Sequence, residues 1–389
     1  MPTVNRFADL HDEITAWRRD FHANPETLFD VERTAGIVAA KLREFGCDEV
    51  VEGIGRTGVV GVIRGRQTGS GRTIGMRADM DALPIQEVRD IPHKSTVPGK
   101  MHACGHDGHT AMLLGAAKYL AETRNFDGTA VVIFQPAEEG GGGGKVMVDD
   151  GMMDRWNIQE VYGMHNAPDR DFGTFAIRPG ALMASADFFE IHVEAKGGHA
   201  AKPQGCIDPA IVVAQLIQSF QAIVSRNTDP VESLVISVTH IEMGDTNNVI
   251  PSTAFMEGTV RTLRPDVRDL AEKRMGEVCE HVGAMHGAKV AFDYKRLYPV
   301  TVNHPEQTDF AASIAREIAG ADAVEADAPP VMGGEDFSFM LESRPGAFIF
   351  LGQGHGAGLH HPEYDFNDEV IPVGCSYWAK LVETAMPAS

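Results

Sequence analysis

A dense group of metal-binding side chains lies in residues 101–109, MHACGHDGH. Three histidines, one cysteine and one aspartate precede an apolar run that predicts a helix. Thiolate and imidazole groups suit zinc and its neighbours in the transition series, and a turn rich in glycine lets them converge on one cation. A helix-capping loop with surface histidines and a core cysteine is the alternative. The density of donors favours a metal site that uses Cys104 and His106.

Adjacent glutamates, Glu138 and Glu139, follow the segment TAVVIF, which predicts a buried strand. Ligands of open α/β sheets bind outside the carboxyl ends of the strands. One carboxylate of such a pair can coordinate a metal while its neighbour takes a proton from water. A solvated surface pair is the alternative, but this location favours a site. For the glycine run at residues 140–144 we predict only backbone freedom near the metals.

Two further histidines, His165 and His361, follow apolar segments in comparable positions. Each alone would more often be a structural residue. Combined with the donors above they complete a set of five ligands: Cys104, His106, Glu139, His165 and His361. Such a set suits two nearby metal ions that share a bridging ligand and water. Asp79 and Asp81 also end a predicted strand, where they either orient ligands or cap the following turn.

Alternating strand and helix patterns surround these residues and predict an α/β fold. Residues 4–45 read as helical, and strands follow in GVVGVIRG, TIGMRADMD and TAVVIF. The continuous apolar run AVVIF predicts a strand covered on both faces, hence a sheet between helical layers. After residue 299 the pattern resumes with the helix TDFAASIAREIAG, the strand GAFIFLGQG and a closing helix at 373–384.

A different pattern occupies residues 185–297, which we predict to be an inserted domain. Strand FFEIHVEA alternates, with Phe189, Ile191 and Val193 on one face, and Asp208 followed by Pro209 begins a helix. The order strand-helix-strand-strand-helix-strand predicts a ferredoxin-like α+β unit. The catalytic, metal-binding α/β domain is then formed by residues 1–184 and 298–389.

The amino-acid composition argues against two classes of binding partner, nucleic acids and membranes. The 389 residues carry 34 basic and 55 acidic side chains, a net charge of −21. Such a surface repels phosphate backbones and anionic lipid, so we expect neither nucleic-acid nor membrane binding. The apolar runs are too short to span a bilayer, and the first residues lack a secretory pattern. Five scattered cysteines indicate a reduced, cytoplasmic protein.

Eight segments of the chain resemble the metal-dependent amidohydrolase branch of the aminoacylase and carboxypeptidase family, which includes hippurate hydrolases. They are MRADMDALPIQE, MHACGHDGHTAMLLGAA, VVIFQPAEEGGGGGKVM, GMHN, VEAKGGHAAKP, NVIPSTAFMEGTVRTL, MGGEDFS and LHHPEYDFND. The resemblance runs in order over residues 18–368. It implies a zinc-peptidase-like α/β/α catalytic domain in which Cys104, His106, Glu139, His165 and His361 bind two divalent metals. Glu138 would be the general base, with Asp81 holding it.

The resemblance also assigns roles within the inserted domain. His199, contributed by the other subunit of a dimer, would polarise the scissile carbonyl. Asn248 and Arg261 would bind the substrate carboxylate. Arginine offers a bidentate fork for a carboxylate, and histidine can stabilise a developing oxyanion. The alternative is that Arg261 pairs with a surface glutamate and that His199 is an ordinary loop residue. We expect a homodimer, or an oligomer built from dimers, formed through this domain.

The predicted reaction is hydrolysis of N-acyl amino acids, hippurate among them, to a carboxylic acid and a free amino acid. A small-peptide or carboxypeptidase-type hydrolase and a diaminopimelate-type deacetylase are alternatives with the same site. A non-catalytic protein that binds a metal or an amino-acid derivative is the alternative from another class, and the presence of Glu138 argues against it. Manganese or zinc is the expected metal, with nickel and cobalt also compatible with these ligands.

Overall fold

The computed structural model describes residues 5–388, which fold into two compact units. The first unit is built from Met1–Leu182, Val302–Pro329 and Asp336–Ser389. The second is built from Met183–Thr301 and Pro330–Glu335. Within the described residues, no helix is both long and apolar enough to cross a membrane.

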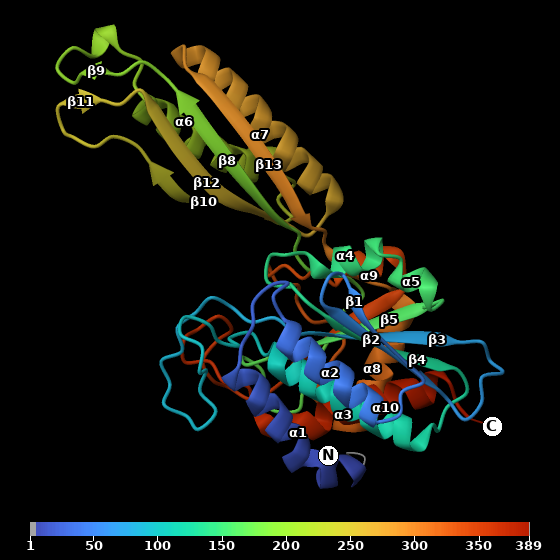
Figure 1. The fold of residues 1–389 in the computed structure, drawn as a ribbon. Helices are drawn as coiled ribbons and strands as arrows, with labels where there is room; N and C mark the ends of the chain where they lie inside the picture. Colours follow the sequence, from blue (N-terminus) through green and yellow to red (C-terminus); the bar gives the residue numbers. More distant parts are fainter. Residues whose placement is uncertain (1–4, 389) are drawn as a thin grey trace. The chain divides into compact units, whose positions relative to one another are not determined.

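The first unit is an α/β domain, which confirms the predicted fold class (Figure 1). Its helices are α1 (Asn5–Ala23), α2 (Glu32–Glu44), α3 (His106–Thr123), α4 (Gly143–Asp149), α5 (Met152–Arg155), α8 (Pro305–Ala319), α9 (Ser338–Ser343) and α10 (Ile371–Ala385). Its sheet strands are β1 (Glu49–Ile54), β2 (Gly58–Arg64), β3 (Thr73–Asp79), β4 (Thr129–Gln135), β5 (Glu160–Ala167), β6 (Phe175–Ala176), β15 (Val324–Glu325) and β16 (Gly346–Gly352). Two further strands, β7 (Gly180–Met183) and β14 (Thr301–Asn303), lie where the chain passes between the units.

Eight strands form one sheet in the order β1-β2-β4-β3-β5-β16-β6-β15. The central strands β4, β3, β5 and β16 run parallel to one another. Because parallel strands end at the same edge, the residues that follow β3, β4 and β5 are brought together there.

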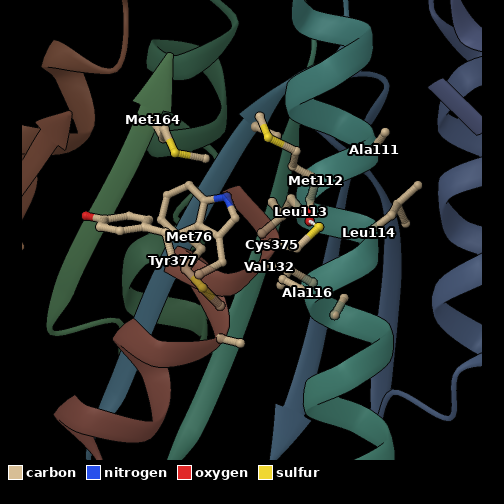
Figure 2. Packing of buried hydrophobic residues seen from close by; sticks show 14 of the residues in the cluster. Met76, Ala111, Met112, Leu113, Leu114, Ala116, Val132, Met164, Cys375 and Tyr377 are labelled. Carbon is tan, nitrogen blue, oxygen red and sulfur yellow. Dashed lines mark hydrogen bonds between the residues drawn. The ribbon is translucent and has the colours of Figure 1, made fainter. Parts of the chain in front are cut away.

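Helices cover both faces of this sheet, as the buried run AVVIF predicted. A continuous apolar core joins α1, α2, α3, α8 and α10 to one face, and Figure 2 shows the α3 side chains Met112 and Leu113 near Cys375 of α10. The two helices approach so closely that a Cβ on Gly374 would lie 2.2 Å from the sulfur of Met112. On the other face, α4 packs against β4 and α9.

The prediction of a helical segment over residues 4–45 was wrong in one respect. The chain leaves the helix after Ala23 and begins the next at Glu32, and residue 4 lies outside the described residues. Pro25 lacks a backbone donor and disfavours helical geometry in the residue before it. The intervening loop is joined to the segment that follows β3 by an isolated parallel bridge between Thr27 and Ala82.

The second unit is the ferredoxin-like unit that the element order predicted. Its elements are β8 (Ala186–Glu194), β9 (Gly198–His199), α6 (Pro209–Ala222), β10 (Leu234–Glu242), β11 (Val249–Ile250), β12 (Thr253–Thr262), α7 (Pro265–His286) and β13 (Lys289–Tyr298). Four antiparallel strands pair in the order β10-β12-β8-β13, and α6 and α7 share one apolar core with them. Asp208 caps α6 through the Ala210 N–H at 2.9 Å, as predicted. Phe189, Ile191 and Val193 are all buried on one face of β8.

The second unit extends beyond the predicted range 185–297. It includes residues 330–335, which are distant in sequence. The amide of Ala184 donates to the carbonyls of Val331 and Gly333. These backbone hydrogen bonds explain why residues 330–335 belong with this unit.

Candidate metal centre and active site

Four predicted ligands converge at the carboxyl edge of the sheet. Cys104 lies just before α3, His106 begins it, Glu139 follows β4, and His165 lies within β5. The Cys104 sulfur is 3.4 Å from His165 Nε2, and His106 Nε2 is 3.9 Å from Glu139 Oε1. Glu138 Oε2 lies 4.0 Å from the same His106 nitrogen. The predicted general base therefore borders the ligand cluster.

Backbone carbonyls fix the tautomers of both histidines. Because a carbonyl only accepts hydrogen bonds, His106 Nδ1 donates to the Asp81 carbonyl at 2.8 Å, and His165 Nδ1 donates to the Asn166 carbonyl at 2.7 Å. In each neutral ring the lone pair is then on Nε2, which faces the cluster. Such outer hydrogen bonds are the usual way in which proteins orient imidazole ligands.

The cluster fits divalent metal ions. His106 Nε2 and Glu139 Oε1 are both buried without a hydrogen-bond partner among residues 5–388, a costly state that a cation would relieve. Burial and the neighbouring carboxylates hold the pKa of the Cys104 thiol well above its ordinary value. A bound cation would lower this pKa, because cysteine binds metals as the thiolate. Sulfur, nitrogen and oxygen donors together suit zinc and related metals.

Asp81 holds the loop that carries the two glutamates. Its carboxylate accepts the N–H of Glu138 at 2.9 Å and the N–H of Glu139 at 3.1 Å. Burial raises the pKa of Asp81, and the hydrogen bond with His106 acts in the opposite direction. Through these two hydrogen bonds, Asp81 holds the backbone of Glu138, the predicted base, and not its carboxylate.

The glycine run at residues 140–144 has a packing role that the sequence did not show. A Cβ on Gly143 would lie 1.7 Å from the Pro136 carbonyl oxygen, and one on Gly144 would lie 2.9 Å from the Asp336 carbonyl oxygen. Gly140 adopts a φ of 96°, a region that side chains disfavour. The glycines let the chain fold back against the strand end that carries the glutamates.

Among the described residues, His361 lies outside the cluster, and the geometry favours the preceding histidine in its place. The ring of His361 accepts the N–H of Glu363 at 3.1 Å. His360 instead places Nε2 3.4 Å from Glu139 Oε1 and forms a candidate ligand group with Glu139 and Cys104. A left-handed φ of 61° at His360 directs its side chain differently from that of an extended residue. Two adjacent histidines cannot be distinguished by spacing alone.

Sequence analysis missed a buried polar network beneath the cluster. His109 Nδ1 lies 2.6 Å from Asp79 Oδ1, and Arg77 donates to both Asp79 and Asp336, at 2.8 and 2.9 Å. Burial would raise the pKa of Asp79, but His106 and Arg77 lower it well below its ordinary value. His109 and Asp336 stood in the quoted segments HACGHDGH and MGGEDFS, which was the available signal.

In the second unit, His199 and Asn248 lie together. Strands β9 and β11 pair His199 with Val249, and the Asn248 carbonyl accepts the N–H of Ala200 at 3.0 Å. Arg261, on β12, donates to the carbonyls of Val260 at 3.1 Å and Asp187 at 3.5 Å and forms no ion pair among the described residues. The alternative of a surface salt bridge for Arg261 is therefore not observed, while its substrate role stays a prediction.

Known proteins similar to this chain are consistent with a metal-dependent hydrolase. A hippurate hydrolase of Campylobacter jejuni is 42% identical over 381 residues, covering 98% of each chain. A thermostable carboxypeptidase 2 of Saccharolobus solfataricus is 42% identical over 387 residues, covering 97% of this chain and 96% of its own. A dinuclear metal-binding peptidase of Bacillus subtilis aligns with a TM-score of 0.84 at 34% identity, covering 97% and 99%.

A family model matches most of the chain as well. It spans residues 75–384 and describes the peptidase family M20/M25/M40. This match agrees with the resemblance carried by the eight sequence segments. The chain belongs to the peptidase family M20/M25/M40.

Proposed function

We propose that this protein hydrolyses the amide bond of N-acyl amino acids, hippurate-like compounds included, to a carboxylic acid and a free amino acid. Family membership makes the chain an amide-bond hydrolase. The observation that carries the proposal is the placement of Glu138 beside a buried cluster of ligand atoms. Hippurate is the substrate named for the Campylobacter relative, which supports the choice of an acylated amino acid.

Two divalent cations would be held by Cys104, His106, Glu139, His165 and His360. We propose manganese or zinc, since the donors include sulfur, nitrogen and oxygen. Bound cations supply Lewis acidity, which polarises a carbonyl and lowers the pKa of water. The dinuclear peptidase of Bacillus subtilis supports the number of ions.

Glu138 performs the proton transfers in this proposal. Its carboxylate removes a proton from the attacking water and later delivers that proton to the departing amine. Asp81 fixes the backbone of Glu138 and of its neighbour through two N–H groups. The loop therefore presents the base in one orientation, which a proton transfer between fixed atoms requires.

Residues of the second unit would select the amino-acid half of the substrate. Arg261 and Asn248 would bind the α-carboxylate, and His199, contributed across a homodimer, would stabilise the developing oxyanion. Arg261 donates to the Val260 carbonyl but forms no ion pair among the described residues, and this uncompensated charge supports a role in anion binding. We also propose a cytoplasmic location, supported by five free cysteines.

A carboxypeptidase-type hydrolase is the second candidate. The Saccharolobus relative, named a carboxypeptidase, is as similar in identity as the hippurate hydrolase. Both reactions cleave an amide next to a free α-carboxylate, so the metal cluster and the base serve either one. The length and chemistry of the acyl side separate the two functions.

A substrate panel tests the proposal. N-benzoyl, N-acetyl and N-indoleacetyl amino acids would be compared with dipeptides and blocked peptides, with metal content measured on the same sample. We expect the highest kcat/KM on an N-acyl amino acid. Higher values on peptides would establish the carboxypeptidase alternative, and metal-loaded protein inactive on every amide would overturn hydrolysis itself.

A further inference from the structure

A buried arginine, Arg18 of α1, lies among carboxylates outside the ligand cluster. Its side chain is 0% exposed, and its Nε lies 3.0 Å from Oδ2 of Asp107, which is equally buried. The guanidinium also pairs with Asp365, and its Nη1 lies 3.5 Å from Asp368 Oδ1. A buried guanidinium is tolerated only when its partners compensate the lost hydration. We name these four residues the Arg18 cluster.

The partners of this arginine belong to two segments that carry proposed ligands. Asp107 directly follows His106 at the start of α3, and Asp365 belongs to the segment that begins with His360 and leads to α10. The same two segments meet at a backbone hydrogen bond of 2.7 Å, from the His360 N–H to the Ala103 carbonyl. The guanidinium is therefore a side-chain link between separate parts of the proposed metal site.

Histidines on either side complete the surroundings of the Arg18 cluster. His22 Nδ1 lies 2.8 Å from Asp107 Oδ2, and His93 Nε2 lies 3.1 Å from Asp365 Oδ1. Burial would lower the pKa of Arg18, but the three carboxylates raise it above its ordinary value. The charge is therefore retained at a depth where an isolated cation would be unstable.

We propose that Arg18 is a positioning residue that holds the turn bearing Cys104 and His106 and the segment bearing His360 at the separation required to share metal ions. The inference rests on the metal site of the proposed function, but no hydrogen bond or ion pair of Arg18 within residues 5–388 goes to a proposed ligand. Residues that orient metal ligands from outside contribute about 10- to 100-fold to metal affinity. We expect an effect of that size from the loss of Arg18.

Cobalt is a suitable probe, because a thiolate bound to Co²⁺ gives a charge-transfer absorption band that reports on Cys104. Co²⁺-loaded full-length protein would be titrated with EDTA, and the loss of the band at equilibrium would give the relative cobalt affinity. Arg18→Met should bind Co²⁺ about 10- to 100-fold more weakly, and the band should weaken. Arg18→Lys keeps the positive charge but lacks the bidentate guanidinium, so it should recover part of the cobalt affinity.

Arg6→Met is the matched control. Arg6 also joins α1 to α3, through Glu122 at 3.1 Å, but both side chains are exposed and lie near the far end of α3. Its cobalt affinity should equal that of the parent. A purely structural role for Arg18 would lower the melting temperature of the metal-free protein and leave the cobalt affinity of folded protein unchanged.

A second variant covers the case in which Arg18→Met does not fold. Asp365 is partly exposed, at 18%, so Asp365→Asn should fold while it removes the charge of the nearer of the two carboxylates that link Arg18 to the His360 segment. It should also weaken cobalt binding. Parent-like cobalt affinity in either folded variant would overturn the positioning role. If the parent itself gave no thiolate band, the proposed metal site would be wrong instead.

Discussion

At the scale of single residues, the two adjacent glutamates have different surroundings. Glu139 has a buried oxygen without a hydrogen-bond partner among residues 5–388, and His360 lies 3.4 Å from that oxygen. Glu138 lies at nearly the same distance from His106 as Glu139, 4.0 against 3.9 Å, but among the described residues it does not share the candidate ligand group of Glu139 with Cys104 and His360. Neighbouring positions on one loop can therefore take different tasks, one as a ligand and one as a base.

Glu138→Gln tests the base. The amide keeps the size of the side chain but cannot take a proton from water, so kcat should fall at least about 100-fold. Metal content should stay at the parental value, because the proposed ligands are unchanged. Both quantities would be measured on one preparation. Near-normal turnover with full metal content would remove Glu138 from this role.

His360→Asn and His361→Asn form a matched pair that locates the fifth ligand. Only His360 lies beside Glu139, whereas the ring of His361 accepts a backbone N–H of its own segment. The first variant should lose bound metal, and the second should retain it, as measured by elemental analysis after gel filtration. The reverse result would restore the original prediction for His361.

At the scale of elements, the loop after β4 depends on the absence of side chains. A Cβ on Gly143 would fall within 1.7 Å of the Pro136 carbonyl oxygen, so the backbone of the loop must move. Such a movement would also displace Glu138 and Glu139, because they lie between Pro136 and the glycines. The packing of the glycines and the position of Glu138 and Glu139 are therefore coupled.

Gly143→Ala should lower both stability and activity. Overpacking of a closely packed site costs about 1–3 kcal/mol of unfolding free energy, to be measured by urea denaturation. Gly36→Ala is the control, because nothing lies within 4 Å of a Cβ there and the residue is in α2. Alanine should stabilise that helix by up to about 1 kcal/mol. Equal effects at both positions would contradict the packing role.

At the scale of the whole molecule, the proposed function divides work between two units of the chain. The ligands and the base lie in the first unit, and His199, Asn248 and Arg261 lie in the second. Closure of a domain over a site excludes water and strengthens polar contacts with the substrate. The proposal therefore requires the second unit to contribute to substrate recognition without affecting metal binding.

Arg261→Ala tests this division. Loss of a charge-assisted hydrogen bond costs about 1.5–3 kcal/mol, or roughly 10- to 150-fold in kcat/KM, for substrates with a free α-carboxylate. Substrates with an amidated carboxylate should lose much less, and metal content should not change. Equal losses on both substrate types would show that Arg261 does not bind the carboxylate.

Local patterns in the sequence determined the fold class and most of the elements. The buried strand AVVIF, the Asp208 cap and the alternation of β8 depend on neighbours in the chain, so they can be read from it. The sequence also located the ligand-rich segments, because parallel strands bring their ends to one edge. The helical prediction across Pro25 failed where a single residue outweighed the surrounding propensity.

Only the tertiary structure decided which side chains within those segments meet. His360, with its left-handed φ, lies beside Glu139 while His361 does not, and Gly143 packs against the carbonyl of Pro136, seven residues earlier. Arg18 finds its partners in segments that are distant in sequence. Contacts of this kind are set by packing across the whole unit, which no local pattern of residues encodes.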